Sequence, residues 1–271
     1  MVQGFIGSTE DGATTTLGFE GSDFTATLVG SALNVSDIEI WKDVNGIMTA
    51  DPSLLAEART VKTISYNEAA ELTCMGAKVL HPATIRPTRE NNIPVHVFNS
   101  KEPNAPGTAI TATSKHGEYL FKSIAHKRPV CLLRIASSTA DRSFEMLRTV
   151  RDALCGAGIA LIASVISDRN IVLAVDDIDD IQDLVGELEY SEDIRIEREM
   201  ATVSLVGEDL GIVENAPSLI LKKLDGIDVV MIVYGQTPIS ITYVIKQENL
   251  FPAIDGLHRG FLENHDQNSV V

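Results

Sequence analysis

The sequence predicts an α/β protein in which a parallel-sheet lobe is followed by two ferredoxin-like modules of element order βαββαβ. Three observations lead to this fold class. An apolar strand at residues 38–41 runs into a polar, glycine-containing loop that ends at Pro52, as strands of an α/β sheet do. The pattern of residues changes across a polar linker at residues 111–117, and an internal repeat occupies the chain from residue 130 onward.

The first part of the lobe is expected to form a strand, turn, helix and strand. Residues 5–7 resemble the end of a buried strand, and the β-branched residues 14–17 predict another. A glycine turn at residues 18–23 then leads into a helix, for which Ser22 is a plausible N-cap. The next strand, at residues 34–41, is expected to pair in parallel and complete a β-turn-α-β unit.

The glycine turn at residues 18–23 allows two interpretations. Unpaired backbone N–H groups at a helix start suit a phosphate or a carboxylate. Glycines also close many strand-to-helix turns that bind no ligand, so spacing alone leaves both interpretations open.

A second helix has the clearest start signal in the lobe. Residues 65–68 (SYNE) have the form of a capping box, and the helix is expected to stop near Gly76. In the segment that follows, residues 76–82 (GAKVLHP), Lys78 suits either a phosphate contact or the negative end of the helix dipole.

The end of the lobe is predicted from weaker signals. Residues 83–91 indicate a short helix interrupted by Pro87, and residues 93–98 indicate a strand. We expect the lobe to close near residues 106–108.

The repeat that begins at residue 130 predicts two modules with the order strand, helix, strand, strand, helix. The offset between Gly158 and Gly226 also places residues 171–175 over residues 239–243. Turn-forming residues separate the last two strands in both copies. The first copy comprises residues 130–136, 144–155, 159–165, 170–175 and 178–188, and the second residues 202–206, 213–224, 228–234, 240–245 and 248–261. Neither copy places a nucleophile beside a base, which favours regulation or dimerisation over a second active site.

Composition restricts the partners that we expect. The chain has 271 residues and a formal net charge of -16, which argues against binding of nucleic acid. No run of roughly 18 apolar residues is present, so we expect no membrane association. Cys74, Cys131 and Cys155 are widely separated and indicate reduced, small buried thiols in a cytoplasmic protein. The six histidines are dispersed, and we predict no metal site.

Three separated motifs, at residues 18–23, 41–52 and 76–82, together resemble aspartate kinase, and residues 130–262 resemble the tandem ACT domains of that family. The resemblance implies ATP-dependent phosphorylation of the aspartate β-carboxylate, with allosteric regulation through the ACT domains. It also implies a division of the chain into the nucleotide-binding half of an amino-acid kinase domain, a first ACT domain, a second ACT domain and a tail, at residues 1–112, 118–200, 201–262 and 263–271.

The resemblance assigns residues one position at a time. In the family the glycine turn usually reads Gly-Arg-Gly-Gly-Ser-Asp and binds the substrate amino acid. Ser22 and Asp23 match it as substrate-binding positions, whereas Phe19 stands where the arginine is expected. The strand-end motif, which surrounds ATP with its Mg, usually reads Thr-Asp-Val-Asp-Gly-Val-Tyr-Thr-Ala-Asp-Pro-Arg. Its implied ATP-binding positions in this chain are Lys42, Asp43, Gly46 and Met48, together with Lys78 at the ATP-contacting lysine of residues 76–82.

The resemblance also bears on partners and activity. Ser167 and Asp168 are the available effector-binding residues, with lysine or threonine as the effector, and the ACT domains are expected to form a homodimer. The amino-terminal Lys-Phe-Gly-Gly-Thr-Ser motif of the family is absent from the sequence, so no catalytic residue is assigned. We therefore expect this chain alone to be an inactive or weak kinase. The alternative is a noncatalytic amino-acid-sensing or dimerisation subunit.

Overall fold

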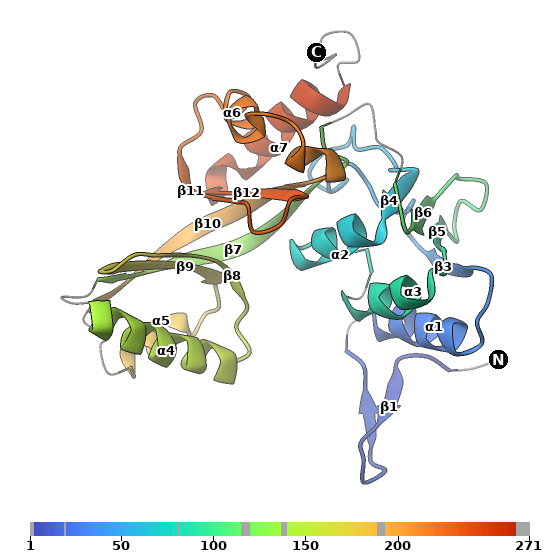
Figure 1. The fold of residues 1–271 in the computed structure, drawn as a ribbon, viewed down its shortest axis with the longest axis horizontal. Helices are drawn as coiled ribbons and strands as arrows, with labels where there is room; N and C mark the ends of the chain where they lie inside the picture. The colour runs from blue at the N-terminus through green and yellow to red at the C-terminus, as the bar shows by residue number, and fades with distance from the viewer. Residues whose placement is uncertain are drawn as a thin grey trace.

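The structure, a computed structural model, describes residues 3–18, 20–77, 79–80, 82–114, 120–136, 140–188 and 193–263 (Figure 1). An α/β lobe is formed by the amino-terminal part of the chain, and two ferredoxin-like modules share one long sheet beside it (Figure 1). The predicted fold class, an α/β lobe followed by two such modules, is confirmed.

The lobe is built on a four-stranded sheet with the order β3-β5-β6-β4. β3 (Ile38–Lys42) is parallel to β5 (Val95–Asn99), and β4 (Thr63–Ser65) is parallel to β6 (Thr108–Thr111). β5 and β6 are antiparallel, so the sheet is mixed. The carboxyl ends of β3 and β5 meet at one edge, where ligands bind in sheets of this kind.

The described residues of the lobe also form the helices α1 (Gly21–Ala32), α2 (Tyr66–Cys74) and α3 (Ile85–Asn91), the last preceded by a 3-10 turn at Pro82–Thr84. α1 and α3 contact each other, and α2 lies between the lobe and the modules (Figure 1). Pro87 does not interrupt its helix, because it lies in the first turn of α3, where no intrahelical N–H bond is lost.

The capping box predicted at the start of α2 is confirmed. The Ser65 hydroxyl accepts a hydrogen bond from the Glu68 N–H (3.1 Å), and the Glu68 carboxylate accepts one from the Ser65 N–H (2.9 Å). The two bonds satisfy donors that would otherwise have no partner at the helix start.

The amino-terminal strands differ from the prediction. β1 (Ile6–Ser8) and β2 (Thr14–Thr16) form an antiparallel hairpin that projects from the lobe (Figure 1). Ile6 is 45% exposed, so the buried strand expected at residues 5–7 is wrong. The parallel β-turn-α-β unit is also wrong, because β3 takes β5 as its parallel partner and β2 stays outside that sheet.

The modules share a six-stranded antiparallel sheet with the order β11-β12-β10-β7-β9-β8. Its strands are β7 (Ser123–Ala136), β8 (Leu161–Ile166), β9 (Asn170–Asp176), β10 (Ile194–Val206), β11 (Val229–Tyr234) and β12 (Ser240–Lys246). The two central strands, β7 and β10, are each long enough to serve both modules. The boundary expected between residues 200 and 201 therefore falls inside β10.

Each half of β7 belongs to a different module. Residues 130–136 pair with β9 and with the first half of β10, within the first module. Residues 123–127 pair with residues 202–206 of β10 and thereby supply the fourth strand of the second module. This strand precedes the first module in the chain, which is why the repeat did not reveal it.

Helices cover one face of each module. α4 (Ala140–Gly156) and α5 (Ile181–Gly186) belong to the first module, and α6 (Ala216–Leu221) and α7 (Leu250–His258) to the second. A π-helical turn, Arg259–Glu263, extends α7. Separate apolar cores lie beneath the helices of the two modules.

The cysteines follow the prediction in one case out of three. Cys131 on β7 is fully buried, and burial raises the pKa of its thiol to about 12. Cys74 and Cys155 are exposed, so their expected role as buried hydrophobic residues is wrong. Both lie at or near the end of a helix, on the side away from its core.

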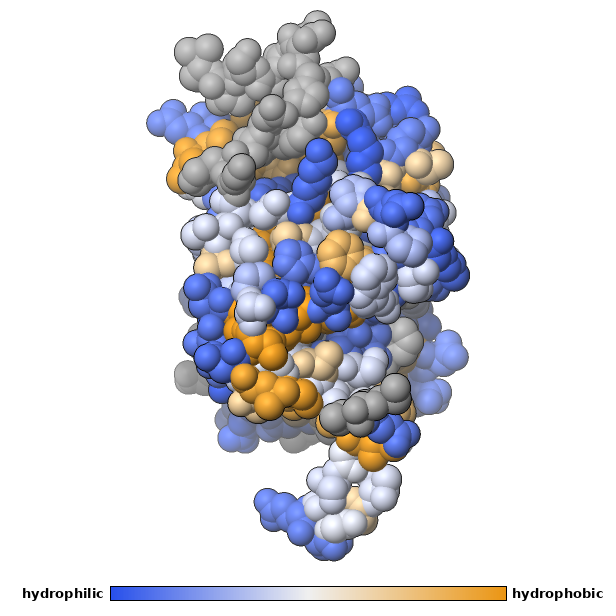
Figure 2. All heavy atoms as spheres, turned by 90° about the vertical axis from the view of Figure 1, so that its right-hand side faces the viewer, coloured by the Kyte–Doolittle hydropathy of each residue, from blue (hydrophilic) through white to orange (hydrophobic). Residues whose placement is uncertain are grey.

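The lobe exposes apolar side chains. Figure 2 shows hydrophobic surface gathered just above the projecting hairpin on the face that carries the lobe, and the exposed residues of the lobe include Leu28, Leu33 and Trp41. An open groove in the same lobe is lined by residues of both α1 and α3. In the part of the chain that the structure describes, no helix is both long enough and apolar enough to cross a membrane.

Gly76, just after α2, lies where the lobe contacts the modules, and a substitution there tests how much this contact contributes to stability. Its φ is +102°, and a Cβ at this position would overlap the carbonyl oxygen of His126 on β7. We expect Gly76→Ala to lower the free energy of unfolding by about 3 kcal/mol, through backbone strain and overlap together. Chemical denaturation measures the loss.

Gly226 supplies the matched control. It also has a positive φ, +76°, but no atom lies within 4 Å of the position that its Cβ would take. Gly226→Ala should cost about 1 kcal/mol, from the backbone alone. Equal losses in the free energy of unfolding for the two variants would mean that the close approach of Gly76 to β7 does not contribute to stability.

Candidate functional site

The turn before α1 places acidic side chains at the edge of the lobe. Gly18 and Glu20 have positive φ values of 84° and 60°, and the helix begins at Gly21. Glu20 is the N-cap residue and makes no side-chain cap bond, so the prediction of Ser22 as N-cap is wrong. Ser22 is exposed in the first turn of the helix, whereas Asp23 is buried.

Lys42, the last residue of β3, joins three separate segments of the chain. Its ammonium group lies 2.6 Å from Glu20 Oε1 and 2.8 Å from Asp23 Oδ2, and it donates a 2.6 Å hydrogen bond to the carbonyl of Val79. The side chains of Lys42 and Glu20 are each 15% exposed. All three predicted motifs therefore meet at the carboxyl end of β3.

The Lys42 cluster withdraws three charged side chains from water. The Lys42 ammonium faces the Glu20 and Asp23 carboxylates in a place where none of the three side chains is more than 15% exposed. Charged groups buried in this way need close partners, so the cluster holds the turn before α1 against the end of β3.

The loop from β3 to β4, residues 43–62, continues from this cluster. Asp43 points into solvent, with its carboxylate 3.8 Å from the Lys101 ammonium. Gly46 has a φ of +89° and packs directly against Thr108, whose hydroxyl accepts a bond from the Ile47 N–H (2.9 Å). Thr108 thus requires a glycine at residue 46 and fixes the start of the loop.

The far end of the β3–β4 loop folds against the modules. Met48 forms an isolated bridge with Thr60, and its carbonyl accepts a 2.7 Å bond from the Ser123 hydroxyl of β7. The backbone of Ile124 likewise donates to the Thr49 carbonyl (2.9 Å). Met48 therefore contacts the second module, unlike Lys42 and Asp43 at the strand edge.

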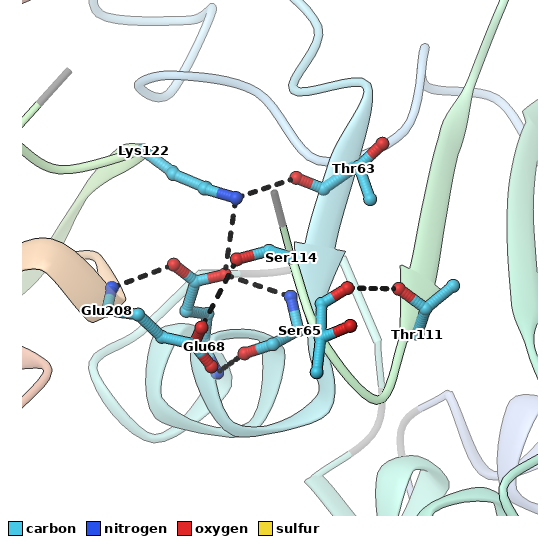
Figure 3. A network of polar contacts seen from close by, with 8 residues as sticks. Thr63, Ser65, Glu68, Thr111, Ser114, Lys122 and Glu208 are labelled. Atoms are coloured by element: carbon cyan, nitrogen blue, oxygen red, sulfur yellow. Dashed lines mark hydrogen bonds and ion pairs between the residues drawn. The ribbon is translucent and has the colours of Figure 1, made fainter. Parts of the chain in front are cut away.

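α2 is tied to the modules through a buried carboxylate, shown in Figure 3. Glu68 is fully buried, and its Oε1 accepts a 2.9 Å bond from the Glu208 N–H. Its Oε2, which also takes part in the capping box, lies 3.7 Å from the Lys122 ammonium. One carboxylate therefore holds the start of α2, the 3-10 turn after β10 and the start of β7 together.

The same face of α2 contacts the second module further along. The Glu71 carboxylate accepts bonds from the hydroxyls of Ser240 (2.5 Å) and Thr237 (3.2 Å). Glu68, Glu71 and Met75 follow helical spacing, so a single stripe of α2 lies on the sheet of the modules. The segment that carries Lys78 begins at the end of this helix.

The remaining predicted residues lie elsewhere. Lys78 and Phe19 lie outside the described residues. Ser167 and Asp168 are exposed in the turn between β8 and β9, where the Ser167 hydroxyl is engaged by its own turn, accepting from the Asn170 N–H (3.1 Å). Within the described ranges, no group of three His, Cys, Asp or Glu side chains could hold a metal ion.

Sequence reasoning missed two contributors to the site. Glu20 lies in the motif at residues 18–23 but was given no role, although a charge two residues from an expected N-cap was a usable signal. The Val79 carbonyl leaves no signal in a sequence, because every residue carries one.

Comparisons with known proteins show which proteins this chain resembles. Residues 1–99 match the family model described as the amino acid kinase family. Aspartokinase 1, chloroplastic, of Arabidopsis thaliana is 35% identical over 284 residues, which cover 100% of this chain and 50% of that protein. Lysine-sensitive aspartokinase 3 of Escherichia coli is 34% identical, over 97% of this chain and 60% of that protein. The chain is similar to these aspartokinases over nearly its whole length.

A solved structure extends the relationship to three dimensions. E. coli aspartokinase III in complex with aspartate and ADP superimposes with a TM-score of 0.83 at 34% identity, covering 97% of this chain and 60% of that one. This chain spans about half the length of the curated relatives that it matches first.

The Lys42 cluster makes a prediction for stability. Lys42→Met leaves the Glu20 and Asp23 carboxylates without their shared cation in a place where their side chains are 15% and 8% exposed. We expect a loss of about 3 kcal/mol in the free energy of unfolding, measured by urea denaturation. Arg86→Met is the control, because its ion pair with Glu90 is exposed. If Lys42→Met and Arg86→Met lower the free energy of unfolding by equally small amounts, Lys42 does not hold the cluster together.

Proposed function

We propose that this chain supplies the nucleotide-binding and regulatory parts of an aspartate kinase, which transfers the γ-phosphoryl group of ATP to the β-carboxylate of aspartate. The observation that carries the proposal is the Lys42 cluster. It unites the segments that the resemblance to aspartate kinase assigns to substrate and nucleotide, at the strand edge where such folds bind ligands.

The nucleotide would be held at the carboxyl ends of β3 and β5. Asp43 and Lys101 present charged groups to solvent at this edge, with side chains 71% and 73% exposed. Lys42 would orient Asp23 and the residue 79 backbone beside them. Lys78, one residue before Val79, is the proposed phosphate contact.

Aspartate would be recognised at the start of α1. Ser22 offers an exposed hydroxyl in the first turn of the helix, next to the Asp23 carboxylate that the Lys42 ammonium holds in place. Phosphoryl transfer depends mainly on positioning and charge neutralisation, and the bound ATP with its Mg supplies the phosphoryl group. The residues of this chain hold the two reactants near each other and exclude alternative orientations.

A noncatalytic sensing or dimerisation subunit is the second candidate. The contacts of Lys42 favour this candidate. Its ammonium already donates to two carboxylates and a carbonyl, so it would have to lose one of these partners to neutralise a phosphate. In both readings the modules would respond to an amino acid, lysine or threonine, and Ser167 and Asp168 remain the proposed effector contacts.

Nucleotide binding separates the two candidates. Titration of the chain with Mg-ATP by calorimetry should give a dissociation constant that rises about 10- to 100-fold in Lys78→Ala, because a charged hydrogen bond is lost. Lys222→Met, an exposed lysine of the second module, controls for the change in net charge. Equal affinities for wild type and Lys78→Ala would exclude the proposed site, and no binding to wild type would favour the sensing subunit.

Self-association is predicted for both candidates. The sheet of the modules ends in two edge strands that expose apolar side chains, Leu161, Val165 and Ile166 on β8 and Ile232 and Tyr234 on β11. We expect a homodimer through these modules, detected by light scattering at micromolar concentration. Val165→Lys should shift the population toward monomer, whereas a wild-type monomer would contradict the expectation.

A further inference from the structure

The second module reaches the β3–β4 loop through a buried histidine. His258, the last residue of α7, is fully buried, and its Nε2 lies 2.9 Å from the hydroxyl of Thr49. Its other ring nitrogen, Nδ1, lies 3.0 Å from Oε1 of Glu263 in the π-helical turn. A buried imidazole with a partner on both nitrogens has a fixed ring orientation.

The hydrogen-bond network assigns the proton positions. A carboxylate can only accept, so Nδ1 of His258 carries a proton toward Glu263. In the neutral ring Nε2 is then an acceptor, and the Thr49 hydroxyl donates to it. The Thr49 hydroxyl oxygen also accepts a hydrogen bond from the Arg59 N–H (2.9 Å). The hydroxyl therefore donates to His258 and accepts from Arg59 at the same time.

Thr49 and Arg59 lie where the two arms of the β3–β4 loop, residues 47–49 and 59–61, pair with each other; we call this paired region the neck of the loop. The Thr49 N–H donates to the Arg59 carbonyl (2.8 Å), and the Val61 N–H donates to the Ile47 carbonyl (2.8 Å). The Arg59 guanidinium donates in turn to the carbonyl of Leu262, again in the π-helical turn (2.8 Å). The end of α7 therefore holds both strands of the neck.

We propose that His258 is a positioning residue for the β3–β4 loop: from the second module, it fixes Thr49 and so sets the path of the backbone that follows Asp43 and Gly46. The effect on ATP rests on the proposed function, whereas the effect on the loop does not. Thr108 fixes the start of the loop from within the lobe, and His258 fixes its far end from the module. A shift of α7 would be transmitted to the loop through this bond.

Hydrogen exchange tests the role of His258 without any nucleotide. In His258→Leu, the amides of Thr49, Arg59 and Val61 should exchange about 10-fold faster, the consequence of one lost hydrogen bond. The amide of Met75, which closes α2, should keep its rate. His258→Gln, which can still bond to the Thr49 hydroxyl, should restore most of the protection.

A partner variant and a core control keep the result interpretable. Thr49→Val removes the same bond from the other side, and the double variant with His258→Leu should exchange no faster than the more affected single variant. Ile254→Val trims the core beneath α7 and leaves the bond in place. Unchanged loop exchange in His258→Leu, or an equal rise in Ile254→Val, would overturn the positioning role.

A Mg-ATP titration of the same variants tests the consequence for nucleotide binding. We expect about 10-fold weaker binding in His258→Leu and near wild-type binding in His258→Gln. If wild type binds and His258→Leu binds equally well, loop order and nucleotide affinity are not linked. If wild type binds no ATP, the proposed function fails, and the exchange rates still decide the role of His258.

Discussion

The lobe depends on the ammonium group of Lys42. A cation withdrawn from water needs acceptors on most sides, and this one finds two carboxylates and a backbone carbonyl from segments before and after it in the chain. The start of α1, the end of β3 and the segment after α2 are consequently fixed relative to one another.

The lobe and the second module are joined as closely as parts of one domain. Ala125 and Val206 of the shared sheet contribute to the core of the lobe, and Ala50 and Leu55 of the β3–β4 loop contribute to the core of the second module. Glu68 adds a buried polar link between them. Because packed interiors do not deform continuously, a change in the module has direct routes to both α2 and the loop.

The sequence predicted features whose signals are local. The capping box at Ser65 and the strand that ends at Lys42 each depend on residues a few positions apart. The parallel pairing of β3 with β5, the pairing of the first half of β7 with β10 and the bond between His258 and Thr49 depend on residues far apart in the chain. A short β-branched run specifies a strand but not its partner, and a lone histidine gives no indication of what it will contact.

The same distinction holds for the candidate site. The three motifs were recognisable one by one, and their order along the chain matched a family. Their meeting point was not, because Lys42 was assigned to ATP binding and its contacts with Glu20, Asp23 and the Val79 carbonyl depend on the folded chain.

The shared strand β7 has a consequence for how the molecule is made. Since the first half of β7 completes the second module, the first module is topologically an insertion within the second. During synthesis the second module cannot close its sheet until the whole first module has emerged, and its final contacts span a long stretch of chain. The first module can fold early as a unit, and its closure then brings the two distant halves of the second module together.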